Sequence, residues 1–399
     1  MKKNKKTIGI ISTMGGAKWG GSEFLWHSFA EYCISVNYHC IISISEITMQ
    51  SRQMVELKRA GHATLNMRKS LHSYVCKGIF FISKRLYKDY FIGAQRIAAL
   101  LFFLDPYRRI FSSESEYIIL SQGRTYDVFE DPFLMYWTLK KTKKTICICH
   151  WNTDYSRPHF FSFSTYQRIF QSFDKIFFVS KENWKATERQ LAHRFTNAFL
   201  AKNPINRPSD NYIEFPDFGD NYYVGCVALL NSYNKGQDIL LEVLSSNKWK
   251  KRNLKILMFG EGDDAGYYQE LINLYELDEK VRLMGHQDVD YIWAQCQLLV
   301  QPSISEGLPL SLIEGMISGR AAVVTHIAGM PEIVSEGVNG FIAEAPKACF
   351  LDAALERAWK SREAWKSMGL SARETALAYY EKEPGKRLFE MIHVSNTKF

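Results

Sequence analysis

Short runs of apolar residues recur along the chain, and segments with helical spacing stand between them. The first run, at residues 6–13 (KTIGIIST), is followed by a glycine-rich loop and by residues 24–36, whose apolar positions have the spacing of a helix. Further apolar runs occupy residues 116–123, 144–152 and 174–180. Short strands that are apolar on both faces and alternate with helices are typical of a parallel sheet covered on both sides. We therefore predict a first α/β domain over residues 1–203.

A second alternation of apolar runs and helical segments begins after a break in the pattern. Residues 204–221 contain three prolines and one glycine, as an interdomain linker would. Residues 222–380 then resume the alternation, and residues 381–399 are expected to form a helical tail that could cross back to the first domain. Two doubly wound, Rossmann-like domains facing a central cleft are expected, with ligands at the carboxyl ends of the strands.

Composition is that of a globular protein, with 46% hydrophobic and 23% charged residues. The longest apolar run, residues 97–104, is far shorter than the roughly 20 residues that span a bilayer. The apolar stretch behind the basic N-terminus breaks at Gly15 and Gly16, which is too early for a secretory signal. We expect a cytoplasmic protein.

The net charge of +8 is unevenly distributed. Residues 1–203 hold 30 Lys and Arg against 15 Asp and Glu, whereas residues 204–399 hold 20 against 27. The basic half is expected to favour anionic surfaces. Residues 71–109 combine cations with aromatic rings, among them Lys77, Lys84, Arg85, Lys88, Arg96, Arg108 and Arg109 with Phe80, Phe81, Tyr87, Phe91, Phe102 and Phe103. This stretch is either a set of helices packed on the first sheet or a surface that lies on an anionic membrane.

Two glutamates stand eight positions apart in residues 305–315 (SEGLPLSLIEG). Pro309 is favourable at the first turn of a helix, and the residues after it have helical spacing. Glu306 would then lie on a loop in front of free helix amides, and Glu314 about one turn into the helix. Such carboxylates suit vicinal diols on either side of a phosphate group. The alternative is a pair of solvated surface glutamates.

The flanks of this stretch carry a family resemblance. Residues 305–344 resemble the E-x7-E region of retaining family 4 glycosyltransferases (group 1), which have the GT-B fold. In the expected order, GGSE at 20–23 resembles the N-terminal glycine loop, ICHWN at 148–152 the strand end with the family histidine, and ALLNSYNKGQ at 228–237 the donor-phosphate loop. The resemblance covers most of the chain and is weakest over residues 49–116. It implies a retaining glycosyltransferase of hexosyl type, which would build a cell-surface polysaccharide or another glycan.

The resemblance also implies roles for residues of the second domain. Glu314 would hold the ribose of a nucleotide-sugar donor, and Glu306 the donor sugar. The amides of Gly307 and Leu308, together with Lys235, would face the diphosphate. Family members work without a metal, so neither a metal ion nor another cofactor is expected.

Further implied site residues lie in glycine loops and at one strand end. His150, with Gly20 and Gly21, would lie at the reacting centre, and the loop that begins at Gly260 would border the donor nucleotide. The expected acceptor is a glycan or a lipid-linked sugar, and no nucleic acid is expected to bind.

One position departs from the family pattern. The phosphate loop of the family usually carries an arginine where this chain has Leu229, and a permanently charged partner for phosphate is thereby lost. Two other functions therefore stay open. One is a non-catalytic, glycosyltransferase-like binding subunit, and the other is a sugar-nucleotide epimerase with the GT-B fold.

Three short motifs have competing interpretations. Residues 260–265 (GEGDDA) fit a dinucleotide-binding fingerprint, but Asp263 and Asp264 would face a pyrophosphate with like charge. Residues 288–290 (DVD) imitate a metal-binding D-x-D, although their place suits a helix N-cap with an acidic first turn. Cys147 and Cys149 precede His150, and their alternation favours two small core residues over zinc ligands.

Overall fold

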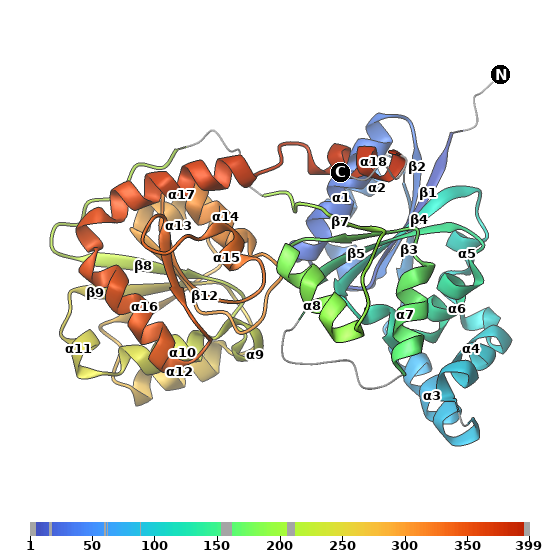
Figure 1. Ribbon diagram of the computed structural model, residues 1–399, viewed down its shortest axis with the longest axis horizontal. Helices are drawn as coiled ribbons and strands as arrows, with labels where there is room; N and C mark the ends of the chain where they lie inside the picture. Colours follow the sequence, from blue (N-terminus) through green and yellow to red (C-terminus); the bar gives the residue numbers. More distant parts are fainter. Residues whose placement is uncertain are drawn as a thin grey trace. The chain divides into compact units, whose positions relative to one another are not determined.

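The computed structural model describes residues 5–15, 18–59, 61, 63–87, 89–152, 162–205 and 212–394. The chain divides into two compact units (Figure 1). Unit 1 comprises Met1–Pro204 together with Glu381–Phe399, and unit 2 comprises Ile205–Tyr380. None of the helices among these residues has the length and hydropathy that a membrane span requires.

Unit 1 is built on a parallel sheet in the order β3-β2-β1-β4-β5-β6-β7. Its strands are β1 (Thr7–Ser12), β2 (His39–Ser45), β3 (Ala63–Arg68), β4 (Ser115–Arg124), β5 (Lys144–Trp151), β6 (Lys175–Phe178) and β7 (Ala198–Leu200). Its helices are α1 (Gly21–Ser35), α2 (Arg52–Arg59), α3 (Leu71–Leu86), α4 (Tyr90–Leu100), α5 (Arg108–Phe111), α6 (Pro132–Lys140), α7 (Phe163–Ser172), α8 (Lys181–Leu191) and α18 (Pro384–His393), with 3-10 turns η1 (Thr48–Gln50), η2 (Phe102–Leu104) and η3 (Asp127–Glu130). The strand order reverses direction between β1 and β4, where such sheets bind ligands.

The sheet of unit 1 is buried on both faces, as its sequence predicts. Along β5, Cys147 and Cys149 face one core while Ile146 and Ile148 face the other. Successive side chains of a strand point to opposite faces, so two apolar layers require a continuous apolar run. The interpretation of the two cysteines as small core residues is confirmed.

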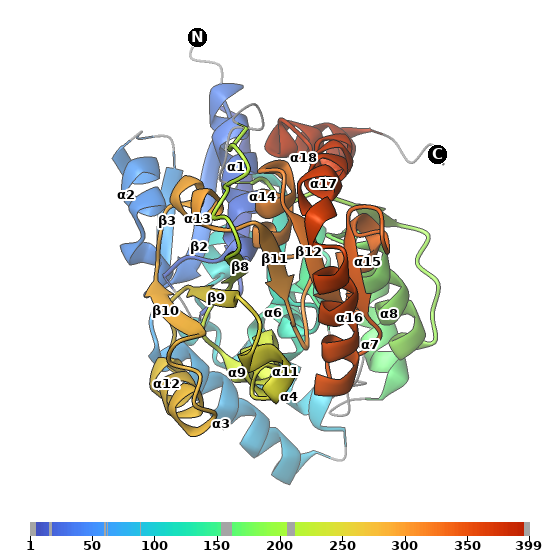
Figure 2. The ribbon, with the colours of Figure 1, turned by 90° about the vertical axis from the view of Figure 1, so that its left-hand side faces the viewer.

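Unit 2 has a second parallel sheet, in the order β10-β9-β8-β11-β12-β13. Figure 2 shows β10, β9, β8, β11 and β12 in this order from left to right. The strands are β8 (Tyr222–Val227), β9 (Leu254–Phe259), β10 (Val281–Gly285), β11 (Leu298–Gln301), β12 (Ala321–Thr325) and β13 (Gly340–Ala343). The helices are α9 (Ser232–Lys235), α10 (Gln237–Leu244), α11 (Asn247–Lys250), α12 (Ala265–Leu274), α13 (Val289–Gln295), α14 (Leu310–Ile317), α15 (Met330–Ile333), α16 (Ala348–Lys360), η4 (Arg362–Ala364) and α17 (Trp365–Tyr379).

Part of the segment that the sequence suggests as a linker packs on unit 2. The buried Arg320 donates to the carbonyl oxygens of Ile213 at 3.2 Å and Glu214 at 2.9 Å. Phe215 packs against one of the two cores of this unit. The guanidinium group thus ties residues 213–215 to the start of β12.

The last helix, α18, belongs to unit 1 and lies against α1 (Figure 1). Gly385 makes the close approach possible, because a Cβ there would lie 2.2 Å from the carbonyl oxygen of Ser28. Lys175 donates from Nζ to the carbonyl oxygens of Met391 at 2.6 Å and Val394 at 2.7 Å, at the C-terminal end of the helix. A cation at this end is favourable to the helix dipole.

Candidate functional site

A largely buried ion pair joins two loops at the carboxyl end of the second sheet. Lys235, the last residue of α9, places Nζ 2.7 Å from Oε1 of Glu306, which lies between β11 and α14. Ser303 donates to the same oxygen at 2.8 Å, and Gln301 donates in turn to Ser303 at 3.1 Å. The Glu306 side chain is only 8% exposed. Its carboxylate is fixed through Oε1, and the described residues place no donor on Oε2.

Helix α14 begins directly behind this carboxylate. Pro309 is the N-cap, with φ of −63° and ψ of 128°, so it precedes the first turn that the sequence suggests for it. Glu314 is the fifth residue of the helix, and both glutamates are buried. They are therefore not solvated surface residues. Within the described part of the chain, the amides of Gly307 and Leu308 donate no hydrogen bond, and the partial positive charge of the helix start lies beside them.

The loop that carries Leu229 is held by its backbone. Gln237 donates to the carbonyl oxygen of Leu229 at 2.9 Å. Leu229 is 54% exposed. At the other end of the loop Gly236 has φ of +63°, and a Cβ there would lie 2.2 Å from the carbonyl oxygen of Pro302. This close approach brings Lys235 to the loop of Glu306. The departure at Leu229 thus leaves an apolar side chain in solvent.

The glycines of the loop at 260–265 have a packing reason. Gly260 has φ of +136°, and a Cβ there would lie 2.0 Å from the carbonyl oxygen of Ala228. Asp264 accepts from both the amide and the hydroxyl group of Ser232, at 2.7 and 2.8 Å, and these bonds lower the pKa of its carboxyl group. The loop therefore rests against the Leu229 loop, and Asp264 is directed to a hydroxyl group.

The residues 288–290 begin a helix, as their position suggests. Asp288 is the N-cap of α13 and Asp290 is in its first turn. The Asp288 side chain makes no capping hydrogen bond, so only the position of the predicted cap is found.

His150 lies at the carboxyl end of β5 in unit 1. Its ring is buried, and Nε2 lies 3.1 Å from the hydroxyl oxygen of Ser121 in the neighbouring strand β4. Burial lowers the pKa of His150 to about 4, against a smaller opposing effect of the Asn203 side chain. The imidazole is therefore neutral at pH 7, and it can donate one hydrogen bond and accept another without carrying charge.

Gly20 and Gly21 start helix α1, which follows the carboxyl end of β1. Gly20 is the N-cap and Gly21 the first helical residue, whereas Gly16 and Ala17 of the same loop lie outside the described residues. Two hydrogen bonds hold the helix start, because the buried Glu23 accepts from Ser12 at 2.7 Å and from the Trp26 indole. Burial raises the pKa of Glu23, and these hydrogen bonds oppose the rise.

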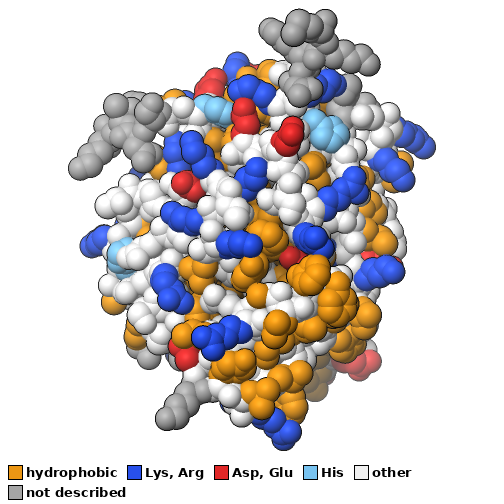
Figure 3. Space-filling model, turned by 90° about the vertical axis from the view of Figure 1, so that its right-hand side faces the viewer, with side chains coloured by type: hydrophobic (Ala, Val, Ile, Leu, Met, Phe, Trp, Pro, Cys, Tyr) orange, Lys and Arg blue, Asp and Glu red, His pale blue; other side chains and the backbone are white. Residues whose placement is uncertain are grey.

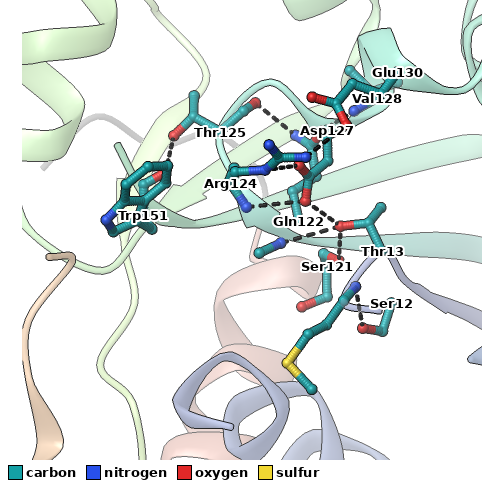
Figure 4. A network of polar contacts seen from close by, with 12 residues as sticks. Ser12, Thr13, Ser121, Gln122, Arg124, Thr125, Asp127, Val128, Glu130 and Trp151 are labelled. Carbon is teal, nitrogen blue, oxygen red and sulfur yellow. Dashed lines mark hydrogen bonds and ion pairs between the residues drawn. The ribbon is translucent and has the colours of Figure 1, made fainter. Parts of the chain in front are cut away.

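A network of polar side chains links the ends of β1, β4 and β5 (Figure 4). Asp127 accepts from the hydroxyl group of Thr13 at 2.7 Å and from Nε of Arg124 at 2.8 Å. Thr13 accepts in turn from the amide of Gly123 at 3.1 Å. Arg124 also forms an ion pair with Glu130 at 2.6 Å, and its side chain is 55% exposed. An oriented carboxylate and an accessible guanidinium group thus stand at the point where the strand order reverses.

The side chains that orient the site were not predicted from the sequence. Thr13 directly follows β1, and Ser303 comes two residues after β11. Asp127 comes three residues after β4. Polar residues at the carboxyl ends of parallel strands were therefore a usable signal.

One group of potential metal ligands occurs among the described residues, namely His72, Cys76 and Asp131. Asp131 Oδ2 accepts from the hydroxyl group of Tyr107 at 2.6 Å and lies 2.7 Å from His72 Nε2. Asp131 Oδ1 caps α6 through the amides of Phe133 and Leu134. Hydrogen bonds within the protein account for every contact of this carboxylate.

Unit 2 is similar to known glycosyltransferases in sequence. Residues 211–375 match the family described as glycosyl transferases group 1. EpsD of Bacillus subtilis (strain 168), a putative glycosyltransferase by name, is 29% identical over 163 residues, which are 41% of this chain and 42% of EpsD. The N-acetyl-alpha-D-glucosaminyl L-malate synthase of Bacillus anthracis is 26% identical over 140 residues, which are 35% of this chain and 37% of that enzyme. The chain thus spans less than half the length of either relative.

The similarity of fold extends over both units. The structure of Anabaena Alr3699/HepE in complex with UDP and glucose has a TM-score of 0.68 at 15% identity, over 98% of this chain and all of that one. Sucrose-phosphate synthase from Thermosynechococcus elongatus has a TM-score of 0.69 at 14% identity, over 97% and 98%. Unit 2 is thus similar to the group 1 glycosyltransferases over residues 211–375, and the chain has the GT-B fold.

Proposed function

We propose that this chain transfers a sugar from a nucleotide-sugar donor to a glycan or lipid-linked acceptor, with the anomeric configuration retained and without a metal ion. The observation that carries the proposal is the Lys235–Glu306 pair beside the start of α14. The pair places the cation of Lys235 and the carboxylate of Glu306 beside the start of a helix. Only one oxygen of this carboxylate, Oε1, accepts hydrogen bonds from described residues. The match of residues 211–375 to the group 1 glycosyltransferase family supports the assignment.

Transfer requires stabilisation of the departing nucleotide diphosphate, whose charge grows as the bond to the sugar breaks. Lys235 supplies a permanent positive charge, and the amides of Gly307 and Leu308 supply donors at the positive end of α14. Together they can neutralise a diphosphate, which is the reason for proposing a metal-independent reaction. Gly260 would border the nucleotide.

The two glutamates would bind hydroxyl groups. Oε1 of Glu306 is taken by Lys235 and Ser303, so Oε2 is the oxygen that we assign to a donor-sugar hydroxyl group. Glu314 would hold the ribose. A carboxylate that accepts from a hydroxyl group contributes about 1.5–3 kcal/mol as a charged hydrogen bond.

We assign the acceptor to unit 1. His150, with Gly20 and Gly21, would serve the reacting centre, and the neutral imidazole would contribute hydrogen bonds rather than charge. A cytoplasmic location at the inner face of the membrane, through attraction of the basic half to anionic lipid, completes the proposal.

A non-catalytic binding subunit is the second candidate, and the exposed Leu229 favours it. Without the arginine, the diphosphate has one charged partner fewer, and weaker donor binding follows.

A thermal-shift screen against UDP, GDP and ADP, followed by turnover of the matching nucleotide sugar with an acceptor, tests the proposal. Stabilisation by one nucleotide and transfer to the acceptor are expected, with an NMR coupling constant that reports the retained configuration. Transfer should persist in EDTA. Nucleotide binding without transfer would favour the non-catalytic candidate, and isomerisation of the donor without an acceptor would favour the epimerase.

A further inference from the structure

The exposed side of α3, α4 and η2 is unusually apolar. Among the described residues, ten of the twenty-five exposed large hydrophobic side chains fall within residues 71–104. They are Leu71, Tyr74, Phe81, Ile82, Leu86, Ile92, Leu100, Phe102, Phe103 and Leu104, and we call them the apolar surface. Figure 3 shows hydrophobic side chains gathered on this face of unit 1, in the lower half of the view. Helices α3 and α4 pack against each other, so the residues belong to one feature.

Helix α3 carries large apolar side chains on its exposed side. Cys76, Ile79 and Ser83 are buried at the spacing of one helix face. Tyr74 and Phe81, which are 70% and 60% exposed, lie outside that face. A surface helix of a globular protein normally turns its polar residues outward. Here a buried serine faces inward while large apolar side chains lie in solvent, and packing within unit 1 does not explain this.

Cations surround the apolar surface and acids are nearly absent from it. Between residues 57 and 104 the sequence contains one acidic residue, Asp89, and its carboxylate caps α4 through the amides of Phe91 and Ile92. The guanidinium group of Arg85 lies 4.7 Å from the centre of the Phe81 ring, and that of Arg108 lies 4.9 Å from the Phe102 ring. Lys88 lies outside the described residues.

This arrangement corrects part of the sequence-based view of residues 71–109. Phe91 is buried in the core, so it cannot face a membrane. Phe80 packs partly on the same core, and Tyr87 is half-buried. The exposed aromatic residues Phe81, Phe102 and Phe103 are joined instead by leucines and isoleucines that the cation-and-ring pattern did not single out.

We propose that the apolar surface inserts into an anionic phospholipid bilayer, at the boundary between headgroups and acyl chains. Aliphatic and aromatic side chains would enter the boundary, and the neighbouring Lys and Arg side chains would reach the lipid phosphates. The near absence of acids between residues 57 and 104 fits a negatively charged partner. The inference extends the proposed membrane location, on which it rests, from charge attraction to insertion.

Insertion is tested by sedimentation with vesicles of phosphatidylcholine and phosphatidylglycerol, in the absence of nucleotide. The variant Phe81→Ser/Leu86→Ser/Phe103→Ser removes exposed side chains only and should keep the thermal stability of the wild type. We expect vesicle partitioning to weaken on the order of tenfold or more. The matched control Tyr291→Ser/Leu274→Ser/Val338→Ser removes exposed apolar side chains of unit 2 and should partition like the wild type.

The salt dependence of vesicle binding distinguishes insertion of apolar side chains from charge attraction alone. Exposed charges are screened within about 10 Å at 0.1 M salt, whereas apolar burial persists. Wild type should therefore retain part of its binding at high salt, and the serine variant should retain none. Lys84→Glu/Arg85→Glu should lose binding mainly at low salt. Complete release of the wild type by salt, or serine and control variants that bind alike, would overturn insertion.

Two further measurements keep the outcomes distinct. If sedimentation equilibrium shows that wild type self-associates through this surface and does not bind vesicles, the occupant is a second copy and the inference is wrong. Nucleotide binding, measured by thermal shift, should be the same in the serine variant and the wild type. Vesicle binding without nucleotide binding would contradict the proposed transfer reaction and leave the insertion standing.

Discussion

Lys235 and Glu306 are 71 residues apart in the sequence, yet Nζ and Oε1 lie 2.7 Å apart in a largely buried position. The lysine ends α9 and the glutamate precedes α14, so the pair ties the two loops that follow β8 and β11. These strands are neighbours at the point where the order of the second sheet reverses. Each side chain therefore fixes the position of the other at the proposed donor site.

Lys235→Ala should reduce turnover and stability together. The substitution leaves the Glu306 carboxylate with Ser303 as its remaining donor, and a buried charge that loses one partner costs about 1–3 kcal/mol of unfolding free energy. Loss of a fixed cation at the departing diphosphate should cost about 2 kcal/mol or more in transition-state stabilisation. Denaturant unfolding and kcat/KM at a temperature well below Tm measure the two effects separately.

Arg252→Ala is the matched control for this variant. Arg252 forms an ion pair with Glu356 of the same unit at 2.9 Å, and the two side chains are 19% and 23% exposed. Arg252 lies at the amino end of β9, whereas the candidate site lies at the carboxyl ends of the strands. Stability should fall while kcat/KM stays near the wild-type value. Equal turnover of Lys235→Ala and wild type would remove Lys235 from the site.

Glu314→Ala should change nucleotide affinity, whereas Glu306→Ala should change the turnover rate. The ribose contact that we assign to Glu314 should weaken nucleotide binding by about 1.5–3 kcal/mol. Glu306→Ala should mainly lower kcat, because its free oxygen is assigned to the donor sugar. Calorimetric titration with nucleotide and steady-state kinetics distinguish the two. Wild-type values of both quantities in both variants would contradict the assigned roles.

Leu229→Arg should strengthen nucleotide binding. Leu229 is 54% exposed, so an arginine can replace it without displacing core residues, and a charged hydrogen bond to phosphate contributes about 1.5–3 kcal/mol. Leu274→Arg, at an exposed position in the same unit, controls for added charge alone. Nucleotide titration of both variants is the measurement. If wild type binds no nucleotide and Leu229→Arg does, the non-catalytic candidate gains support.

The sequence predicted the strands whose residues are apolar on both faces and missed strands of other kinds. In unit 1, β1, β4, β5 and β6 were found. β2 alternates serine with isoleucine, and β3 is a polar strand at the sheet edge, so neither shows a continuous apolar run. β7 has only three residues, too few for a pattern. A continuous apolar run thus reveals a strand, but a strand that is buried on both faces, such as β2, need not contain one.

Residues of the candidate site were predictable one by one, but their pairing was not. Glu306 and Glu314 lie on the elements that the spacing suggests. The bond between Lys235 and Glu306 depends on Gly236, whose missing Cβ lets the backbone approach Pro302. The bond between Thr13 and Asp127 spans 114 positions. Such contacts follow from packing of whole loops, which local patterns do not contain.

Thr13→Val should loosen the polar network at the carboxyl end of β1. The substitution keeps the shape but removes the donor to Asp127 and the acceptor for the Gly123 amide, at a cost of about 1–3 kcal/mol in unfolding free energy. If this edge binds the acceptor, KM for the acceptor should rise while nucleotide affinity is unchanged. Thr138→Val removes a buried hydrogen bond within α6 and should change stability alone. An unchanged acceptor KM in Thr13→Val would contradict an acceptor site here.

Acid should destabilise the chain through His150. Burial lowers the pKa of this imidazole from 6.5 to about 4 in the folded state. Between these pH values the unfolded chain binds a proton that the folded chain does not, so unfolding free energy falls as pH falls, by roughly 3 kcal/mol across the window. His150→Gln cannot titrate and should lack this part of the loss, whereas His286→Gln, at an exposed position, should follow wild type. Urea unfolding from neutral pH down to about pH 4 is the measurement, and parallel curves for His150→Gln and wild type would show that His150 is not the group that senses acid.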